Sequence, residues 1–101
     1  MHVRLTYMKF LPGMAEQARK IYYENVVGTL KKQKGLLECK LLEPLDKSGD
    51  YISLTSWQSM EDAQAYEASG LYKELVDQVK DLYSQPPVLR SFNAKEVMQT
   101  A

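Results

Sequence analysis

Residues 51–62 read YISLTSWQSMED, and in this stretch a strand runs almost directly into a helix. Aromatic and β-branched side chains are frequent from Tyr51 to Trp57, which is typical of a strand. Ser59, with Asp62 three positions later, has the spacing of a helix start, where a serine hydroxyl accepts a hydrogen bond from a free backbone N–H. The stretch therefore predicts a strand at residues 51–57 and a helix that begins at Met60.

Downstream of this junction the pattern stays helical as far as about Ser84. A bend is expected at Ser69-Gly70, and Pro86-Pro87 ends the helical region. Val88–Val97 is predicted as the last strand. The residues expected on the inward face of the helical region, at helical spacing, are Leu71, Leu75, Val79 and Leu82.

Upstream of the junction the same reasoning predicts further elements. Val3–Phe10 alternates as a strand does, and a helix is expected over residues 14–34. Gly35 follows where a helix C-cap needs a residue that tolerates positive φ. A second strand, Leu36–Glu43, and a hairpin turn at residues 46–50 lead to the junction. The apolar stripe of the helix comprises Met14, Ala18, Ile21, Tyr22, Val26 and Leu30.

The elements thus follow in the order β-α-β-β-α-β along a chain of 101 residues, which is the length of one domain. Short connections and right-handed crossovers favour an α+β, ferredoxin-like fold: a four-stranded antiparallel sheet with two helices on one face. Residues 1–101 are therefore expected to form a single domain.

Both faces of the predicted strands carry apolar side chains. On the first strand Val3, Leu5 and Tyr7 alternate with Thr6, Met8 and Phe10, and on the third Ile52 and Leu54 alternate with Tyr51 and Trp57. Two helices cover only one face, and an apolar face left open normally marks an interface. We expect a homodimer that pairs sheet against sheet as a dimeric α/β barrel, with an open-faced monomer as the alternative. Periodicity leaves open which alternate set faces the helices.

The composition argues against several classes of function. Thirteen basic and thirteen acidic residues give a formal net charge of zero, unlike a nucleic-acid surface built from clustered lysine and arginine. One cysteine, Cys39, rules out an internal disulfide and fits a reducing compartment. The N-terminal segment lacks the apolar core of a signal peptide, and no apolar run approaches the roughly 20 residues that span a bilayer. We expect a cytoplasmic protein without nucleic-acid or membrane partners.

Motifs for metals and phosphates are missing from the sequence. No paired cysteine or histidine spacing supports zinc, and no glycine-rich loop supports phosphate binding. The acidic pair Glu61-Asp62 falls in the first turn of a helix, where its charge stabilises the helix dipole. No metal and no cofactor are therefore expected.

Several stretches resemble the antibiotic-biosynthesis-monooxygenase-like family of the dimeric α+β barrel superfamily, and together they span nearly the whole chain. They are Phe10-Leu11-Pro12-Gly13, Lys34-Gly35-Leu36, Trp57-Gln58-Ser59, Glu61-Asp62-Ala63-Gln64-Ala65-Tyr66 and Ser69-Gly70-Leu71-Tyr72-Lys73. The resemblance implies a ligand between the helices and the sheet, near the tryptophan. It also implies one of two chemistries, or none in non-catalytic relatives. One is oxidation of anthrone-like or quinol substrates by molecular oxygen without metal or flavin, and the other is heme degradation.

Other positions depart from the family pattern. Histidine is common in the family where this chain has Tyr66 and Leu71, and heme-degrading members place an axial histidine where it has Val76. Valine offers no ligand to iron, which argues against heme degradation. The pocket asparagine of those members aligns with Thr6, and that of the oxygen-using members aligns with Ser53. The monooxygenase interpretation is weakened by this last difference but survives it.

The candidate catalytic residues are Trp57, Tyr66 and Ser53. The Trp57 indole can stack on a planar ligand, or it can plug the core. The Tyr66 phenol can orient a substrate hydroxyl, and can deprotonate it only if the phenol pKa is lowered, but packing is the commoner role of a buried tyrosine. The candidate substrate-binding residues are Thr6, Met8, Thr55, Leu71, Tyr72 and Arg4.

Two polar side chains outside this catalytic set also have two interpretations. Arg4 can stabilise a developing phenolate, but a solvated strand end is the commoner role, and the same choice applies to Arg90. Cys39 shares its strand with Leu37 and Leu41, and is predicted to be a small buried side chain rather than a nucleophile.

Three functions follow from these observations. The first is a cofactor-independent monooxygenase in which Trp57 positions a phenolic, quinol or anthrone-like ring and Tyr66 or Ser53 holds a hydroxyl. The second is a non-catalytic barrel that only holds a small hydrophobic ligand, and the third is a heme-binding relative, which Val76 argues against. A shared fold does not decide between them, so enzyme status stays open at this point.

Overall fold

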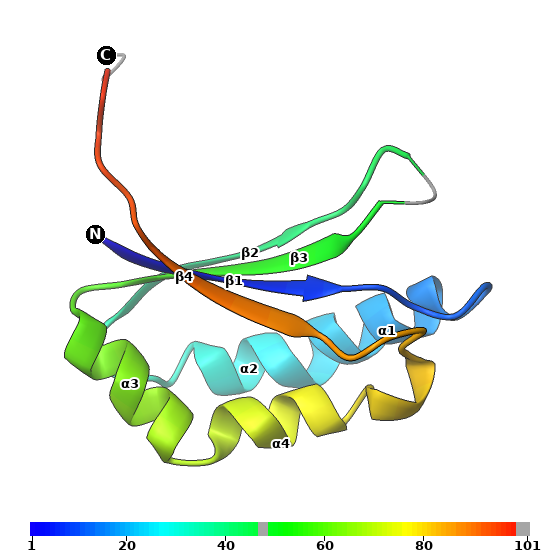
Figure 1. Ribbon diagram of the computed structural model, residues 1–101. Coiled ribbons are helices and arrows are strands. Elements are labelled where there is room, and N and C mark those ends of the chain that lie inside the picture. Colours follow the sequence, from blue (N-terminus) through cyan, green and yellow to red (C-terminus); the bar gives the residue numbers. More distant parts are fainter. Residues whose placement is uncertain (47–48, 99–101) are drawn as a thin grey trace.

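A single antiparallel sheet with the strand order β2-β3-β1-β4 forms one layer of the molecule. In this computed structural model, which describes residues 1–46 and 49–98, the helical segments all lie on one side of that sheet (Figure 1). The strands are β1 (His2–Met8), β2 (Leu36–Leu42), β3 (Tyr51–Trp57) and β4 (Val88–Asn93). This order and the one-sided helical layer confirm the predicted α+β, ferredoxin-like fold.

Two helical arms make up the second layer. The first comprises α1 (Ala15–Ile21), a π-helical turn (Tyr22–Val26) and α2 (Val27–Leu30), and the second comprises α3 (Met60–Ala68), α4 (Leu71–Asp77) and a 3-10 turn (Lys80–Leu82). The Ser59 hydroxyl accepts a hydrogen bond from the Asp62 backbone N–H over 3.1 Å, so the predicted helix start is confirmed. Gly70, with φ of 86°, separates α3 from α4 where the bend was predicted.

The predicted helical faces agree with the burial. Tyr22, Val26 and Leu30 form a core cluster with Trp57 and Tyr66, and Ala18 packs with Val79 and Leu82 in a second cluster. Within the first arm the apolar spacing of three to four residues therefore points one face at the sheet.

Several boundaries differ from the prediction. The first arm ends at Leu30, so Gly35 is not its C-cap. Gly35 instead takes φ of 83° in the loop before β2, and a Cβ there would collide with the Asp62 side chain. β1 stops at Met8 and β4 at Asn93, short of the predicted ends, and the predicted turn at residues 46–50 includes two positions outside the described residues.

The two faces of the sheet are now assigned. Arg4, Thr6 and Met8 are buried beneath the helices. The interpretation of Arg4 as a solvated strand end is therefore wrong, because only 4% of this residue is exposed. Through the strand registers, the apolar residues of the opposite, open face are Val3, Leu5, Tyr7, Leu42, Ile52, Leu54, Val88 and Phe92.

An irregularity in β2 leaves one of its leucines on the surface. The register between β2 and β3 shifts between Leu36 and Glu38, so Leu37 is an extra residue on its strand. Leu37 is exposed, whereas Cys39 and Leu41 keep the helix-facing side. Cys39, Leu37 and Leu41 share β2 as predicted, but Leu37 does not share the burial of the other two, because the bulge breaks the simple alternation.

No helix within the described residues is long and apolar enough to cross a membrane.

Candidate functional site

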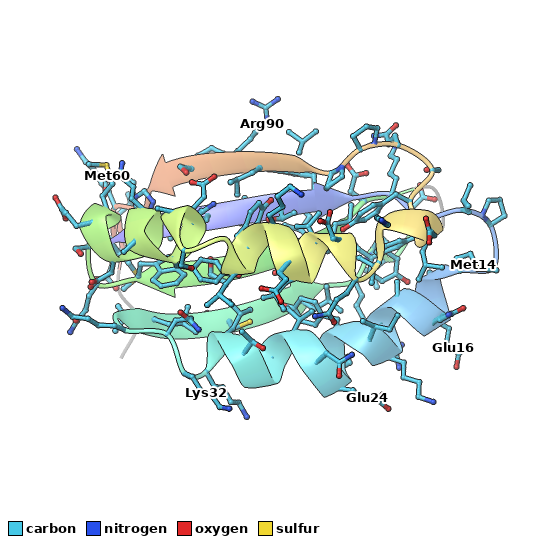
Figure 2. All side chains as sticks on the ribbon, turned by 90° about the horizontal axis from the view of Figure 1, so that it is seen from below. Met14, Glu16, Glu24, Lys32, Met60 and Arg90 are labelled. Carbon is cyan, nitrogen blue, oxygen red and sulfur yellow. The ribbon has the colours of Figure 1, made fainter. Side chains whose placement is uncertain are left out.

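A partly open cavity of about 60 Å³ lies between the sheet and the helical layer. Figure 2 looks onto that layer and shows its two arms lying over the sheet, roughly along the direction of the strands. The polar and aromatic residues that line the cavity are Arg4, Thr6, Phe10, Arg19, Tyr22, Tyr51, Ser53, Thr55, Tyr66, Tyr72 and Tyr83, and the other lining residues are aliphatic or Met8. Because each water needs roughly 10–15 Å³ of such space, the partly open cavity holds about five waters, which is the volume of about one aromatic ring.

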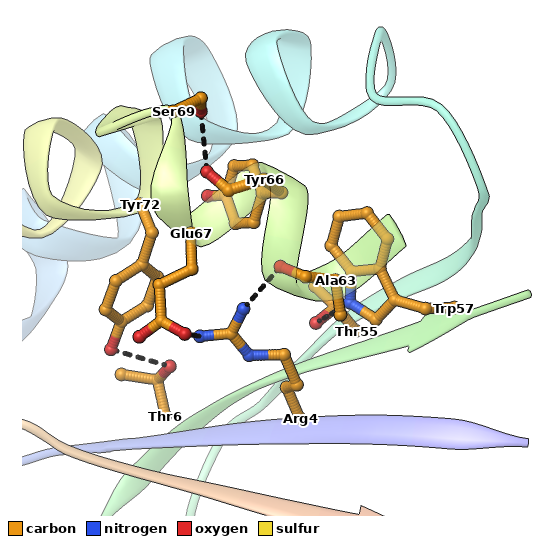
Figure 3. Close-up of polar contacts among 9 residues, drawn as sticks. All are labelled: Arg4, Thr6, Thr55, Trp57, Ala63, Tyr66, Glu67, Ser69 and Tyr72. Atoms are coloured by element: carbon orange, nitrogen blue, oxygen red, sulfur yellow. Dashed lines mark hydrogen bonds and ion pairs between the residues drawn. The ribbon is translucent and has the colours of Figure 1, made fainter. Parts of the chain in front are cut away.

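Arg4 places a buried cation on one wall of this cavity. Its Nη1 donates a hydrogen bond to the Ala63 carbonyl over 3.0 Å, and its Nη2 lies 3.5 Å from the Glu67 Oε1 (Figure 3). The guanidinium carbon lies 5.1 Å from the centre of the Tyr72 ring, within the range of a cation–π contact. Nη2 is buried and makes no hydrogen bond to any described residue. The guanidinium is thus held by one hydrogen bond, one ion pair and one aromatic ring, and its Nη2 donor makes no hydrogen bond to a described residue.

Two hydroxyls lie on the same wall as Arg4. Thr6 follows Arg4 by two residues on β1, and its Oγ1 is 3.4 Å from the Tyr72 Oη. This separation is at the long limit of a hydrogen bond between hydroxyls, whose usual length is about 2.8 Å. The pair therefore has hydrogen-bonding capacity left for a ligand.

Trp57 lies behind the cavity wall. Its side chain is fully buried, and its Nε1 donates a hydrogen bond to the Thr55 Oγ1 over 2.9 Å. The indole stacks on the Tyr66 ring, with ring centres 5.2 Å apart and planes inclined by 28°. Tyr66 itself lines the cavity, so Trp57 acts on the cavity through Tyr66 and Thr55.

A second polar group joins the first arm to the sheet. The Tyr22 hydroxyl lies 2.9 Å from the Ser53 Oγ and 3.2 Å from the Cys39 Sγ. Tyr22 begins the π-helical turn, a feature that is frequent at functional sites. Burial raises the pKa of the Cys39 thiol, which is the opposite of what a nucleophilic cysteine needs.

Aromatic rings close the far end of the cavity. Phe10 stacks on Tyr83 with ring centres 5.4 Å apart, and meets Tyr51 edge-on at 5.5 Å. The Tyr83 hydroxyl is buried without a hydrogen-bond partner among the described residues. This end offers a flat apolar surface with one free hydroxyl.

The cavity is richer in hydrogen-bond donors than in bases. Burial raises the pKa of Tyr66, although the nearby Arg4 charge opposes that shift. Burial likewise raises the pKa of Tyr22 and of Tyr83. These phenols stay protonated at neutral pH, so Tyr66 can donate a hydrogen bond to a ligand oxygen but cannot serve as its base.

The structure brings most of the predicted site residues together. The ones that line the cavity are Arg4, Thr6, Met8, Ser53, Thr55, Tyr66 and Tyr72, and the ones outside its lining are Trp57 and Leu71. Sequence reasoning missed Tyr22, Tyr83 and Glu67 as site residues. The position of Tyr22 in the apolar helical stripe was a usable signal, but nothing local pairs Glu67 with Arg4 across 63 positions.

Metal-binding chemistry finds no support in the described part of the chain, where no group of three or more histidine, cysteine or acidic residues is placed to hold an ion. His2, the one histidine in the sequence, lies opposite Trp57 in the register of β1 and β3.

Known proteins share this architecture. The family model described as antibiotic biosynthesis monooxygenase matches residues 1–78. No curated protein matches the sequence significantly.

Among solved structures, an antibiotic biosynthesis monooxygenase candidate from Deinococcus radiodurans has a TM-score of 0.82 at 15% identity, covering 100% of this chain and 99% of its own. SnoaB, a cofactor-independent oxygenase from Streptomyces nogalater, has a TM-score of 0.80 at 14% identity, covering 98% and 97%. MhuD with manganese protoporphyrin IX bound has a TM-score of 0.75 at 17% identity, covering 100% and 99%. At these identities the likenesses establish the fold alone.

Proposed function

Because the chain belongs to the antibiotic biosynthesis monooxygenase family, we propose that it is a cofactor-independent monooxygenase for a small phenolic, quinol or anthrone-like compound. The observation that carries the proposal is the partly open, aromatic-walled cavity, in which the buried donors Arg4 and Tyr66 and the half-buried donor Tyr72 line a space of about one aromatic ring. SnoaB, which shares the fold, is described as a cofactor-independent oxygenase.

The proposed reaction draws its electrons from the substrate. One atom of molecular oxygen enters the substrate, which loses two hydrogens, and the other atom leaves as water; 1-naphthol, for example, gives 1,4-naphthoquinone and water. The form that reduces oxygen is the deprotonated phenol or enol. Donors aimed at the substrate oxygen stabilise that anion, and its proton passes to water because the buried tyrosines are not bases.

Three residues are assigned roles in this proposal. The Tyr66 hydroxyl donates to the substrate oxygen, since no described residue occupies it, while Ser53 is already bonded to Tyr22. Arg4 supplies positive charge to the same wall. Trp57 is a positioning residue, because it holds the Tyr66 ring by stacking rather than touching the cavity.

Heme chemistry fits this chain poorly. MhuD binds a porphyrin within the same fold, but Val76, at the position of the axial histidine in heme-degrading members, presents an isopropyl group to the cavity and offers no lone pair. The cavity is also much smaller than the 300 Å³ and more typical of sites for drug-sized ligands, let alone a porphyrin.

We also propose that the molecule is a homodimer through the open face of the sheet. Phe92, Leu42 and Val88 are 45%, 41% and 41% exposed on that face, beside half-buried Leu5 and Leu54. Removing such a contiguous apolar surface from water stabilises an assembly, and one two-fold axis covers both copies at once.

Oxygen uptake tests the proposed activity. Purified protein is mixed with 1-naphthol, 1,4-dihydroxynaphthalene or anthrone in an oxygen electrode, and uptake without protein is subtracted. We expect uptake with at least one compound, and a rate about tenfold lower in Tyr66→Phe, which loses one hydrogen bond to a charged oxygen. Tyr23→Phe, which removes an exposed hydroxyl, is the matched control.

The alternative is a non-catalytic ligand-binding protein. Quenching of Trp57 fluorescence by these compounds, without oxygen uptake above background, would favour it and overturn the monooxygenase.

A further inference from the structure

The buried guanidinium of Arg4 lacks a close counter-charge. The Arg4 side chain is 5% exposed, and its ion-pair partner, Glu67, is 52% exposed. Arg4 Nη2 and Glu67 Oε1 are separated by 3.5 Å, whereas a charge-assisted hydrogen bond spans about 2.7–2.9 Å. A buried cation is stabilised chiefly by close, hydrogen-bonded anions, so this solvated and distant carboxylate compensates it incompletely.

The unused donor of Arg4 is the atom that faces Glu67. Nη1 is committed to the Ala63 carbonyl, which fixes the guanidinium beneath α3. Nη2 has no hydrogen-bond acceptor in the described residues, although it is buried. Buried polar groups in folded proteins are nearly always paired, and an orphaned charged donor in the wall of a cavity indicates a missing acceptor.

We propose that Arg4 binds a carboxylate of the aromatic ligand. In the free protein the Glu67 carboxylate lies near Arg4 instead, and the ligand carboxylate displaces the Glu67 side chain toward solvent when it binds. This inference rests on the cavity used in the proposed function, and it narrows the ligand to an aromatic acid. Glu67 is suited to leave because it is half exposed and meets Arg4 from the edge of α3 (Figure 3).

The neighbouring hydroxyls complete the carboxylate site. A carboxylate has two oxygens, and Arg4 Nη2 satisfies one of them. Thr6 and Tyr72, whose hydroxyls are 3.4 Å apart on the same wall, can donate to the other. The Tyr72 ring supports the guanidinium from its face at 5.1 Å, so the positive charge is held in position before the ligand binds.

Two probes that differ by one carboxylate test the inference. Isothermal titration calorimetry under argon gives the Kd of 1-hydroxy-2-naphthoate and of 1-naphthol, so that no oxidation is involved. We expect the naphthoate to bind at least about tenfold more tightly, the strength of one hydrogen-bonded charge pair. Arg4→Gln should remove this preference, because it should weaken naphthoate binding at least about tenfold more than it weakens the binding of 1-naphthol.

Glu67 gives the test its second arm. Glu67→Gln removes the competing carboxylate, so it should strengthen naphthoate binding severalfold and leave 1-naphthol unchanged. Glu74→Gln removes an exposed carboxylate on α4 and is the matched control. A purely structural role for Arg4 predicts no such gain.

The outcomes separate cleanly. The inference is overturned if the two probes bind with equal affinity, if the naphthoate does not bind, or if the preference persists in Arg4→Gln. If Arg4→Gln does not fold, an unchanged naphthoate Kd in Glu67→Gln overturns the inference instead. If the protein takes up oxygen with 1-naphthol but shows no preference for the carboxylate, the proposed monooxygenase activity is supported and the carboxylate site is not. If the naphthoate binds through Arg4 but no oxygen is taken up, the carboxylate site is supported and the monooxygenase activity is overturned.

Discussion

Trp57 stacks on Tyr66, with ring centres 5.2 Å apart, and the indole N–H is used by Thr55 rather than left for a ligand. The lone tryptophan thus belongs to the core, and the phenol in front of it belongs to the cavity. A substitution at Trp57 should therefore change two properties together: the stability of the fold and the position of Tyr66.

Trp57→Phe should lower the free energy of unfolding by about 1–3 kcal/mol. The shorter ring leaves unfilled volume in the core and strands the Thr55 hydroxyl without its donor. Urea unfolding followed by far-UV circular dichroism measures the loss. Thr55→Ser, which keeps the accepting oxygen, should cost less than Thr55→Val, and a Trp57→Phe protein as stable as the original would contradict this account of the core.

Stability should fall at alkaline pH because three buried phenols resist ionisation. The pKa values of Tyr22, Tyr66 and Tyr83 are raised in the folded state by burial. Above about pH 10, the ordinary tyrosine pKa, the unfolded chain loses these protons while the folded chain keeps them, so the free energy of unfolding decreases as pH rises. Each such tyrosine contributes up to about 1.4 kcal/mol per pH unit.

Urea midpoints between pH 8 and pH 11 measure this slope. Tyr66→Phe removes one of the three phenols, so the free energy of unfolding should fall less steeply with pH, by up to about 1.4 kcal/mol per pH unit. Tyr23→Phe, at an exposed position, should leave the slope unchanged. A flat profile up to pH 11 would mean that these hydroxyls are solvated.

The sequence predicted the architecture better than the site. Local signals fixed the Ser59 helix start, the break at Gly70 and the strand Tyr51–Trp57, because each depends on residues close together in the chain. The bulge at Leu37 was not predicted, because the alternation of polar and apolar residues along a strand gives no sign of one inserted residue. Alternation also could not choose between the two faces of β1, and so it misjudged Arg4.

The site depends on contacts between distant segments. Arg4 looked like a solvated strand end because arginine is rarely buried, and its burial is explained only by Ala63, Glu67 and Tyr72, which α3 and α4 bring across it. Tyr22 and Ser53 are 31 positions apart and meet only when the first arm packs on β3. No spacing rule within one element predicts such pairs.

Leu54→Lys should convert the proposed dimer to a monomer. Leu54 lies opposite Leu5 in the register of β1 and β3, on the open face. A buried lysine in each copy would have to lose its hydration without a partner, which disfavours association. Sedimentation velocity at micromolar concentration measures the state, with Gln64→Lys on the exposed side of α3 as the control. A wild-type protein that sediments as a monomer under these conditions would refute the interface.

Gly35→Ala should destabilise the fold more than Gly13→Ala, although both glycines have φ near 80°. An added Cβ at Gly13 meets no atom within 4 Å, so that substitution isolates the conformational penalty of about 1 kcal/mol. At Gly35 the same Cβ would run into the Asp62 side chain, in the first turn of α3. Relief of that collision must shift the loop before β2 or Asp62 in α3, and α3 carries Tyr66 and the Ala63 carbonyl that holds Arg4.

Thermal unfolding of the two variants therefore separates backbone strain from steric collision. We expect Gly35→Ala to lose at least about 1 kcal/mol more than Gly13→Ala, and to weaken binding of 1-hydroxy-2-naphthoate as well. Equal losses in the two variants would show that α3 adjusts freely, and that the loop before β2 does not help to hold the cavity in shape.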